Sequence, residues 1–185
     1  MPREWEPMLT TLATQRYPRL VSHAMMLVGS RSDAEDLVQE ALVATFVGRR
    51  TFEGLAQAEQ YVRRAIVTKF VDRARKSGRE RKLWDRAANA GSVEAGSDHG
   101  SAVGAMVDVG VALRTLPPRQ RACVALRYLD DLTVPQTASL LGLSDGAVKR
   151  YVSDGLRTLG TLMGTDEILD DAEWLVVHPS GGGDR

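Results

Sequence analysis

A segment rich in glycine, alanine and serine, from Ala87 to Gly110, divides the 185-residue chain into two parts. Such a composition buries too little apolar surface to offset the entropy lost on ordering, so we interpret the segment as a flexible linker. On both sides of it, apolar residues recur every three or four positions and little alternation of period two is sustained, which favours helices over strands. The sequence therefore predicts an all-α protein of two small helical domains joined by a linker. Each domain has a thin core and is expected to depend on a partner for rigidity.

Three helices are expected before the linker. They cover about residues 8–27, with an interruption at Pro18, residues 32–47, and residues 58–79 after a loop over 49–57. The tetrapeptide Ser32-Asp33-Ala34-Glu35 has the pattern of a capping box that begins the middle helix, and Gly48 is expected to end it. The middle helix should bury one stripe: Ala34, Leu37, Val38, Ala41, Leu42, Thr45 and Phe46.

The part after the linker has the spacing of a helix-turn-helix over residues 134–159. Thr133 is expected to cap a short helix with Pro135 in its first turn, where the missing N–H does no harm. Gly142 suits the left-handed turn before a final helix over about 145–162. In this motif the second helix enters the major groove, with its first turns nearest the base edges.

The outward face of that final helix is expected to contact DNA. Its residues are Asp145, Gly146, Lys149, Arg150, Ser153, Asp154 and Arg157. Lys149 and Arg150 are natural donors to bases or phosphates, and arginine can donate two hydrogen bonds to guanine. The alternative is a three-helix core with a solvated polar face. Repressors, response regulators and transposases also use this motif, so it does not identify the protein.

Charge is distributed unevenly, although the formal net charge is zero. Tyr61 to Arg86 contains ten Lys or Arg and three Asp or Glu, whereas Thr165 to Arg185 contains six acids and one base. The basic run from Arg73 to Arg86 is expected to contact phosphates, with a solvated helix end as the alternative. Residues 165–178 could form an acidic amphipathic helix that packs on the second domain, or a frayed tail.

Acidic and amide side chains gather on the outward face of the helix expected over 32–47. They are Glu35, Asp36, Gln39 and Glu40. No basic partner for them is evident in the sequence, which suggests a docking surface for basic residues of another protein. The alternative is a plain solvated face, on which Asp33 and Glu35 interact with the helix dipole.

Catalysis, metal binding and membrane insertion find no support in the sequence. The single cysteine, Cys123, excludes an internal disulfide, and the three histidines lack metal-ligand spacing. Nothing resembles a nucleophile–base pair or a phosphate-cradling glycine loop, so we expect a non-enzymatic protein without cofactor or metal. Neither an apolar run of membrane-spanning length nor a signal-peptide core is present, from which we expect a cytoplasmic protein.

Three motifs, in this order along the chain, resemble those of bacterial RNA polymerase sigma factors of the extracytoplasmic-function (ECF) class. The segment Asp33-Ala34-Glu35-Asp36-Leu37-Val38-Gln39-Glu40 resembles the one that binds the β′ clamp helices of the polymerase. Tyr61-Val62-Arg63-Arg64, followed by Asp72 and Arg75, resembles the family's next helix. Leu116-Pro117-Pro118-Arg119-Gln120-Arg121 and the run from Gly142 to Lys149 resemble its second domain. The resemblance covers about residues 17–162.

The resemblance implies a sigma factor that binds core RNA polymerase, recognises and melts the minus-ten element, and recognises the minus-thirty-five element. It places sigma region 2, a helical bundle, at residues 1–86, the linker at 87–110, the region 4 helix-turn-helix at 111–164 and an acidic tail at 165–185. The implied partners are the β′ clamp helices and β subunit of core polymerase, promoter DNA and, as for many members, an anti-sigma factor. The linker is expected to thread near the RNA exit path.

The same resemblance assigns residues to three sites. The residues that bind polymerase are Asp33, Glu35, Asp36, Gln39 and Glu40. The residues at the minus-ten element are Arg49, Arg50, Phe52, Tyr61, Arg63, Arg64, Thr68, Lys69, Arg73, Arg75 and Lys76. The residues at the minus-thirty-five element are Ser144, Asp145, Gly146, Lys149, Arg150, Ser153 and Arg157. Phe52 and Tyr61 are the aromatics available for base stacking, although Tyr61 could equally belong to the core.

The sequence departs from the family pattern at three places. Thr68 stands where Asn is common, Arg150-Tyr151 replaces a Ser-Arg pair, and Asp154-Gly155 replaces a more basic stretch. Gly155 is expected to cost the final helix roughly 1 kcal/mol relative to Ala. Two rival functions stay open: a dimeric helix-turn-helix repressor or activator that binds a palindrome without polymerase, and an adaptor that has lost DNA binding.

Overall fold

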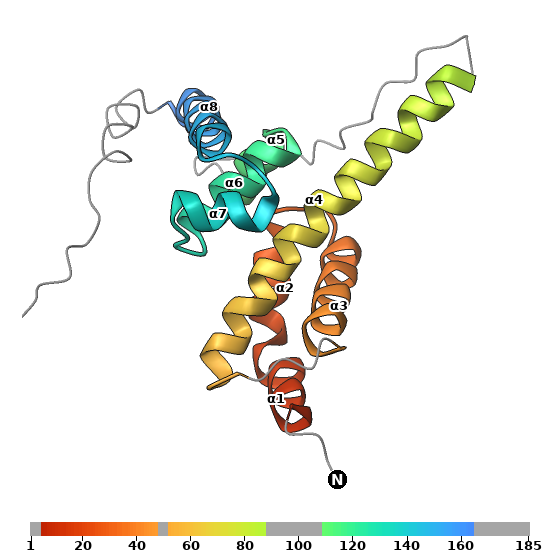
Figure 1. Cartoon of the computed structure of the whole chain (residues 1–185), viewed down its shortest axis with the longest axis vertical. Helices are drawn as coiled ribbons and strands as arrows, with labels where there is room; N and C mark the ends of the chain where they lie inside the picture. The colour runs from red at the N-terminus through yellow and green to blue at the C-terminus, as the bar shows by residue number, and fades with distance from the viewer. Residues whose placement is uncertain (1–4, 48–51, 88–108, 165–185) are drawn as a thin grey trace, which may run out of the picture. The chain divides into compact units, whose positions relative to one another are not determined.

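The computed structural model describes residues 5–47, 52–87 and 109–164, and over 79–87 it describes the backbone alone. Within these ranges every regular element is a helix (Figure 1), so the prediction of an all-α protein is confirmed. The chain separates into two compact units between Arg114 and Thr115, and a short helix, α5 (Val109–Thr115), spans this boundary. The predicted linker over 87–110 lies almost wholly outside the described residues.

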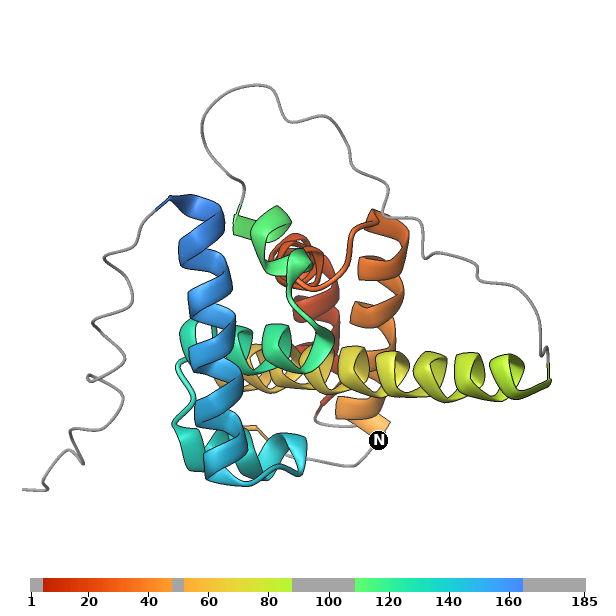
Figure 2. The ribbon, with the colours of Figure 1, turned by 90° about the horizontal axis from the view of Figure 1, so that it is seen from above.

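The first unit is built around a long helix, α4 (Leu55–Ala87), against which α2 (Tyr17–Met25) and α3 (Arg31–Val47) pack. Figure 2 shows the C-terminal part of α4 continuing past α3. The stripe predicted for α3 is confirmed, because all seven of its residues are buried. The buried residues of α4 are Ala58, Val62, Ile66, Val67, Phe70 and Val71. The packing of these apolar stripes decides which side chains of α3 and α4 face solvent.

Several helix boundaries differ from the prediction. The single helix expected over 8–27 is divided into α1 (Glu6–Thr11), a π-helical segment, η1 (Leu12–Arg16), and α2. Pro18 lies in the first turn of α2, where no N–H is needed. The helix α4 begins at Leu55, so the loop predicted over 49–57 is too long, because the amide of Ala58 already donates to the carbonyl of Gly54 at 3.1 Å. It also ends at residue 87 rather than 79.

The capping box predicted at Ser32 to Glu35 is wrong. Ser30 lies directly before the first helical residue, Arg31, and its hydroxyl oxygen accepts from the Asp33 amide at 3.0 Å. The same hydroxyl donates to the Asp33 carboxylate at 2.7 Å. Ser30, three residues before Asp33, therefore caps this helix, and Ser32 is already part of it.

The second unit consists of α6 (Pro118–Tyr128), α7 (Val134–Leu141) and α8 (Asp145–Met163), with α8 packed against both of the others. Thr133 caps α7 in a complete capping box with Gln136, as their side chains and amides bond reciprocally at 3.3 and 2.9 Å. Gly142 has a φ of 62°, the left-handed conformation that was predicted for the turn. Ser144 then caps α8. The predicted helix-turn-helix is therefore present.

Gly155 lies at a point where α8 packs closely against α6. It is buried, and a Cβ atom added to it would lie 2.8 Å from Cγ2 of Val124 and 3.4 Å from Cδ1 of Leu116. A separation of 2.8 Å between carbon atoms is a steric overlap. Glycine at this position lowers the helix propensity of α8, but it permits a close contact with α6 that alanine would disrupt.

We expect Gly155→Ala to destabilise the second unit by about 1–3 kcal/mol, because overpacking outweighs the gain of roughly 1 kcal/mol in helix propensity. Urea unfolding of the full chain measures this change. Gly146→Ala, in the same helix with nothing within 4 Å of the added Cβ, is the matched control and should not destabilise. A more stable Gly155→Ala protein would contradict the close-contact account.

Candidate functional site

The outward face of α3 carries most of the predicted polymerase-binding residues. Asp33, Asp36, Gln39 and Glu40 are exposed, and Glu35 is half-buried. Val43 and Val47 continue the face that contains Asp36 and Glu40, and they are 62% and 74% exposed. Two large apolar side chains exposed beside carboxylates are typical of a protein-binding surface. These valines were not predicted as part of the site from the sequence, although they lie outside the predicted buried stripe.

Two of the acids on this face have basic partners, contrary to the expectation that none would. Arg31 Nε lies 2.8 Å from Oε1 of Glu35, one helical turn away. Arg73 Nη2, on α4, lies 2.8 Å from Oε1 of Glu40, and this hydrogen bond lowers the pKa of the Glu40 carboxyl. The second pair joins residues 33 positions apart in the sequence, so only the packing of α3 on α4 brings them together.

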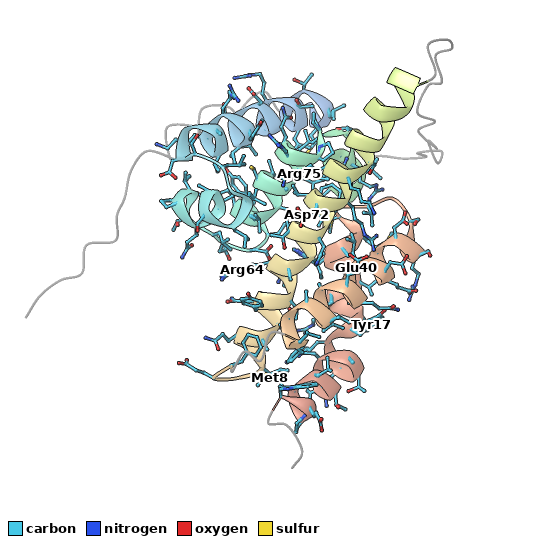
Figure 3. The ribbon with its side chains drawn as sticks, turned by 45° about the vertical axis from the view of Figure 1, so that its right-hand side comes forward. Met8, Tyr17, Glu40, Arg64, Asp72 and Arg75 are labelled. Carbon is cyan, nitrogen blue, oxygen red and sulfur yellow. The ribbon has the colours of Figure 1, made fainter. Side chains whose placement is uncertain are left out.

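The basic residues of α4 follow one another along the helix, as the labelled Arg64 and Arg75 show in Figure 3. Arg75 and Lys76 are exposed, while Arg64, Lys69 and Arg73 are half-buried. Nη1 of Arg75 lies 3.8 Å from the Asp72 carboxylate. These side chains form a positive face suited to a nucleic-acid backbone.

Other predicted minus-ten residues lie differently. Nη2 of Arg63 is 3.3 Å from Nδ1 of the buried His23. The hydroxyl of Thr68 donates to the carbonyls of Ala65 at 2.9 Å and Arg64 at 3.2 Å, so it is bonded within its own helix. Arg49 and Arg50 lie outside the described residues.

A row of aromatic rings runs from the start of the chain to the start of α4. The centroids of Trp5 and Phe46 are 6.0 Å apart, those of Phe46 and Phe52 are 5.8 Å apart, and those of Phe52 and Tyr61 are 5.6 Å apart. Phe46 is buried, while the other three rings are half-buried. Tyr61 therefore packs against its neighbours and keeps part of its surface exposed. Trp5 was not predicted as part of this row from the sequence. It contacts Phe46, which in turn contacts Phe52, and only the fold shows these two contacts.

The predicted face of α8 is exposed at its N-terminal half. Asp145, Gly146, Lys149 and Arg150 are exposed, while Ser153 is half-buried. Ser144 is exposed, and its hydroxyl oxygen accepts from the Ala147 amide at 3.2 Å. Nη1 of Arg157 lies 3.2 Å from the Asp154 carboxylate. The first two turns of α8 thus present cations, as a recognition helix requires.

Reactive groups are few in the part of the chain that the structure describes. Cys123 is fully buried, as expected of a small apolar residue, and burial raises the pKa of its thiol to about 11. Among the described residues, no group of three His, Cys, Asp or Glu side chains could hold a metal ion. Over the same ranges, no helix combines the length and the apolar character that crossing a membrane requires.

Comparisons with known proteins agree with this arrangement. Residues 12–80 match the model of Sigma-70 region 2, and residues 107–159 match that of Sigma-70, region 4. The RNA polymerase sigma-E factor of Streptomyces coelicolor is 30% identical over 144 residues, which cover 78% of this chain and 79% of the relative. The ECF RNA polymerase sigma factor SigM of Mycobacterium tuberculosis is 28% identical over 77% of this chain and 71% of the relative.

A solved structure shares the fold. It is the sigma factor RpoE of Bartonella quintana in complex with the anti-sigma factor NepR. The match has a TM-score of 0.57 and 24% identity, and it covers 89% of this chain and 96% of the other.

The buried contact between His23 and Arg63 makes the stability of the first unit depend on pH. Burial, followed by the charge of Arg63, lowers the pKa of His23 from 6.5 to about 3. His23 is therefore neutral in the folded state but takes up a proton below about pH 6.5 when the chain unfolds. Its contribution to stability is complete above pH 6.5 and is lost as the pH falls toward 3.

We expect the free energy of unfolding to fall by as much as about 2 kcal/mol more in the wild type than in His23→Gln between about pH 7.5 and about pH 5. Urea titrations at the two pH values measure the difference, and the glutamine variant removes only the titrating group. Equal losses in both proteins would mean that His23 is not held neutral by its burial.

Proposed function

The chain belongs to the extracytoplasmic-function class of RNA polymerase sigma factors, and on this basis we propose that separate charged faces of its two units perform docking and promoter recognition. As a sigma factor it directs promoter-specific transcription initiation. The observation that carries the proposal is the separation of charge in the first unit, where α3 exposes carboxylates and α4 exposes cations.

The exposed face of α3 docks on the β′ clamp helices of core polymerase. Asp36, Gln39 and Glu40 supply charge and hydrogen-bond acceptors, and Val43 and Val47 supply the apolar area that a stable interface needs. Asp33 and Glu35 complete the negative face. Carboxylates of this kind steer a basic partner and set the register of docking, while the valines exclude water.

The cations of α4 and the aromatic row bind the minus-ten element. Opening the duplex costs on the order of 1–2 kcal/mol per base-pair step. Stacking of a base on an aromatic ring returns about 1–3 kcal/mol, and lysine and arginine neutralise the backbone. Phe52 and Tyr61 keep ring surface exposed for such stacking, and Arg64, Lys69, Arg73, Arg75 and Lys76 supply the charge. Arg49 and Arg50 keep this assignment, whereas Arg63 and Thr68 have positioning roles.

The recognition helix α8 binds the minus-thirty-five element. Lys149 and Arg150 are exposed on its first two turns, beside Asp145 and Gly146 and after the cap residue Ser144. Ser153 and Arg157 lie farther along the helix and contact the flanking backbone. The reading of bases by the start of this helix follows from the usual docking of helix-turn-helix units in the major groove.

The remaining assignments follow from the family. Region 2 extends over residues 1–86 and region 4 over 111–164, and the linker at 87–110 lets them span the promoter spacer within the polymerase. The protein acts in the cytoplasm, and the chemistry of RNA synthesis belongs to the polymerase. A sigma factor related in fold forms a complex with an anti-sigma factor, and a partner of this kind would hold the present chain inactive.

Asp36→Lys tests the docking face most cleanly, because Asp36 is exposed and makes no ion pair among the described residues. We expect its affinity for core polymerase to fall roughly tenfold or more, since a cation then faces basic residues of the partner. Fluorescence anisotropy of the labelled protein, titrated with core polymerase, measures this affinity.

Two further variants separate docking from folding. Glu40→Arg combined with Arg73→Glu keeps an ion pair between α3 and α4 but reverses the docking charge, so it should fold and bind polymerase poorly. Glu6→Lys, an exposed acid on α1, is the matched control and should bind like the wild type. Retention by Asp36→Lys of an affinity within about twofold of the wild type would count against the docking face.

Run-off transcription tests the assignment of α8. Lys149→Ala combined with Arg150→Ala should retain the affinity for core polymerase but lower transcription about tenfold or more on templates selected with the wild-type holoenzyme. Unchanged transcription would contradict the assignment. Tight binding of the free protein to a palindrome, with no effect of polymerase, would instead favour the dimeric repressor or activator.

A further inference from the structure

Tyr151 of α8 lies between two arginines that come from different helices. Arg119, in the first turn of α6, lies close enough to the phenol of Tyr151 to lower its pKa, and Arg150 adds to the effect. The guanidinium carbon of Arg150 lies 5.4 Å from the centroid of the Tyr151 ring. Both arginines are exposed, and Tyr151 is half-buried. The three side chains therefore form one cluster at the surface, named here the Tyr151 cluster.

The Tyr151 cluster carries two positive charges that no carboxylate of the described residues pairs with. Among the residues that the structure describes, neither Arg119 nor Arg150 forms an ion pair, whereas Arg157 on the same helix is paired with Asp154 at 3.2 Å. Two guanidinium groups that converge on one neutral hydroxyl repel each other. An anion placed between them would remove this repulsion.

The donors of the cluster fit a phosphate group. Each guanidinium presents several N–H donors and no acceptor, and the phenol can donate its O–H. A phosphate has only acceptors and forms strong charge-assisted hydrogen bonds with such groups. Arginine and tyrosine side chains are among the usual contacts to DNA phosphates.

The position of the cluster favours the DNA backbone over the base edges. Arg150 lies in the second turn of α8, next to Lys149, whereas Arg119 reaches this helix from α6, which precedes the helix-turn-helix. In such a unit the start of the second helix approaches the bases, and neighbouring elements approach the phosphates along the groove. A group held by both helices lies at the edge of the groove.

We propose that Arg119, Arg150 and Tyr151 together bind one backbone phosphate of promoter DNA beside the minus-thirty-five element. This inference rests on the proposed binding of that element by α8. It assigns Arg150 to the backbone, leaves base contacts to Lys149 and adds two residues, Arg119 and Tyr151, that the minus-thirty-five site predicted from the resemblance did not include. At position 151 the chain departs from the family's usual arginine, and Arg119 supplies a guanidinium from α6 instead.

The test uses the full chain with core polymerase and measures the dissociation constant for a selected promoter fragment over a range of salt concentrations. Arg119→Gln should weaken binding about tenfold and lower the slope of log K against log salt by about 1. The loss should be the same on templates with single base-pair changes in the minus-thirty-five element, because a phosphate contact carries no sequence information.

Three variants complete the design. Arg119→Lys keeps the charge and should restore most of the salt slope, while Tyr151→Phe keeps the ring and should weaken binding with the slope unchanged. Arg19→Gln removes an exposed charge from α2 and should leave both quantities unchanged. Circular dichroism and urea unfolding verify that the variants fold.

The outcomes distinguish the two proposals. The phosphate site alone would be overturned if Arg119→Gln left the affinity and the salt slope unchanged, as Arg19→Gln should. It would also be overturned if the loss of affinity depended on the identity of one base pair of the element. Absence of any preference of the wild-type holoenzyme for the minus-thirty-five element would overturn the phosphate site together with the proposed function of α8.

Discussion

The packing of α3 against α4 is the constraint on which the first unit depends. Each helix has one apolar stripe, and burial of the two stripes leaves the remaining faces to solvent. An acidic and apolar face of α3 and a basic face of α4 follow directly from this choice. The ion pair between Glu40 and Arg73 joins the two faces at 2.8 Å. Because both groups are substantially exposed, this pair contributes little to stability, and either side chain can exchange it for an external partner.

The second unit depends on a comparable constraint at its glycines. Gly142 allows the left-handed turn between α7 and α8, and Gly155 allows α8 to approach α6 until a Cβ would overlap Val124. The packing of α6 on α8 also brings Arg119 near the phenol of Tyr151. Gly155 would weaken an isolated helix, but in the fold it permits the contact between α6 and α8. It thereby helps to define the surface that we propose faces DNA.

The sequence predicted the features that depend on local pattern. The buried stripe of α3, the helix cap at Thr133 and the turn at Gly142 each follow from local sequence patterns. The prediction from sequence failed where a residue's partner is distant in the sequence, or where two nearby residues could each form the same helix cap. Ser30 rather than Ser32 caps α3, and Glu40 has a partner 33 positions away. Likewise, Arg63 could be seen only as a cation until the fold placed it against His23.

Site-specific photocrosslinking in the complete holoenzyme–promoter complex tests the central claim, which is that the negative face of α3 docks on polymerase while positive faces of the protein bind DNA. A benzophenone side chain introduced at Asp36 should crosslink to the polymerase and leave the promoter unlabelled. The same group at Lys149 should crosslink to DNA at the minus-thirty-five element. Crosslinking of position 36 to DNA, or of position 149 to protein alone, would contradict the account.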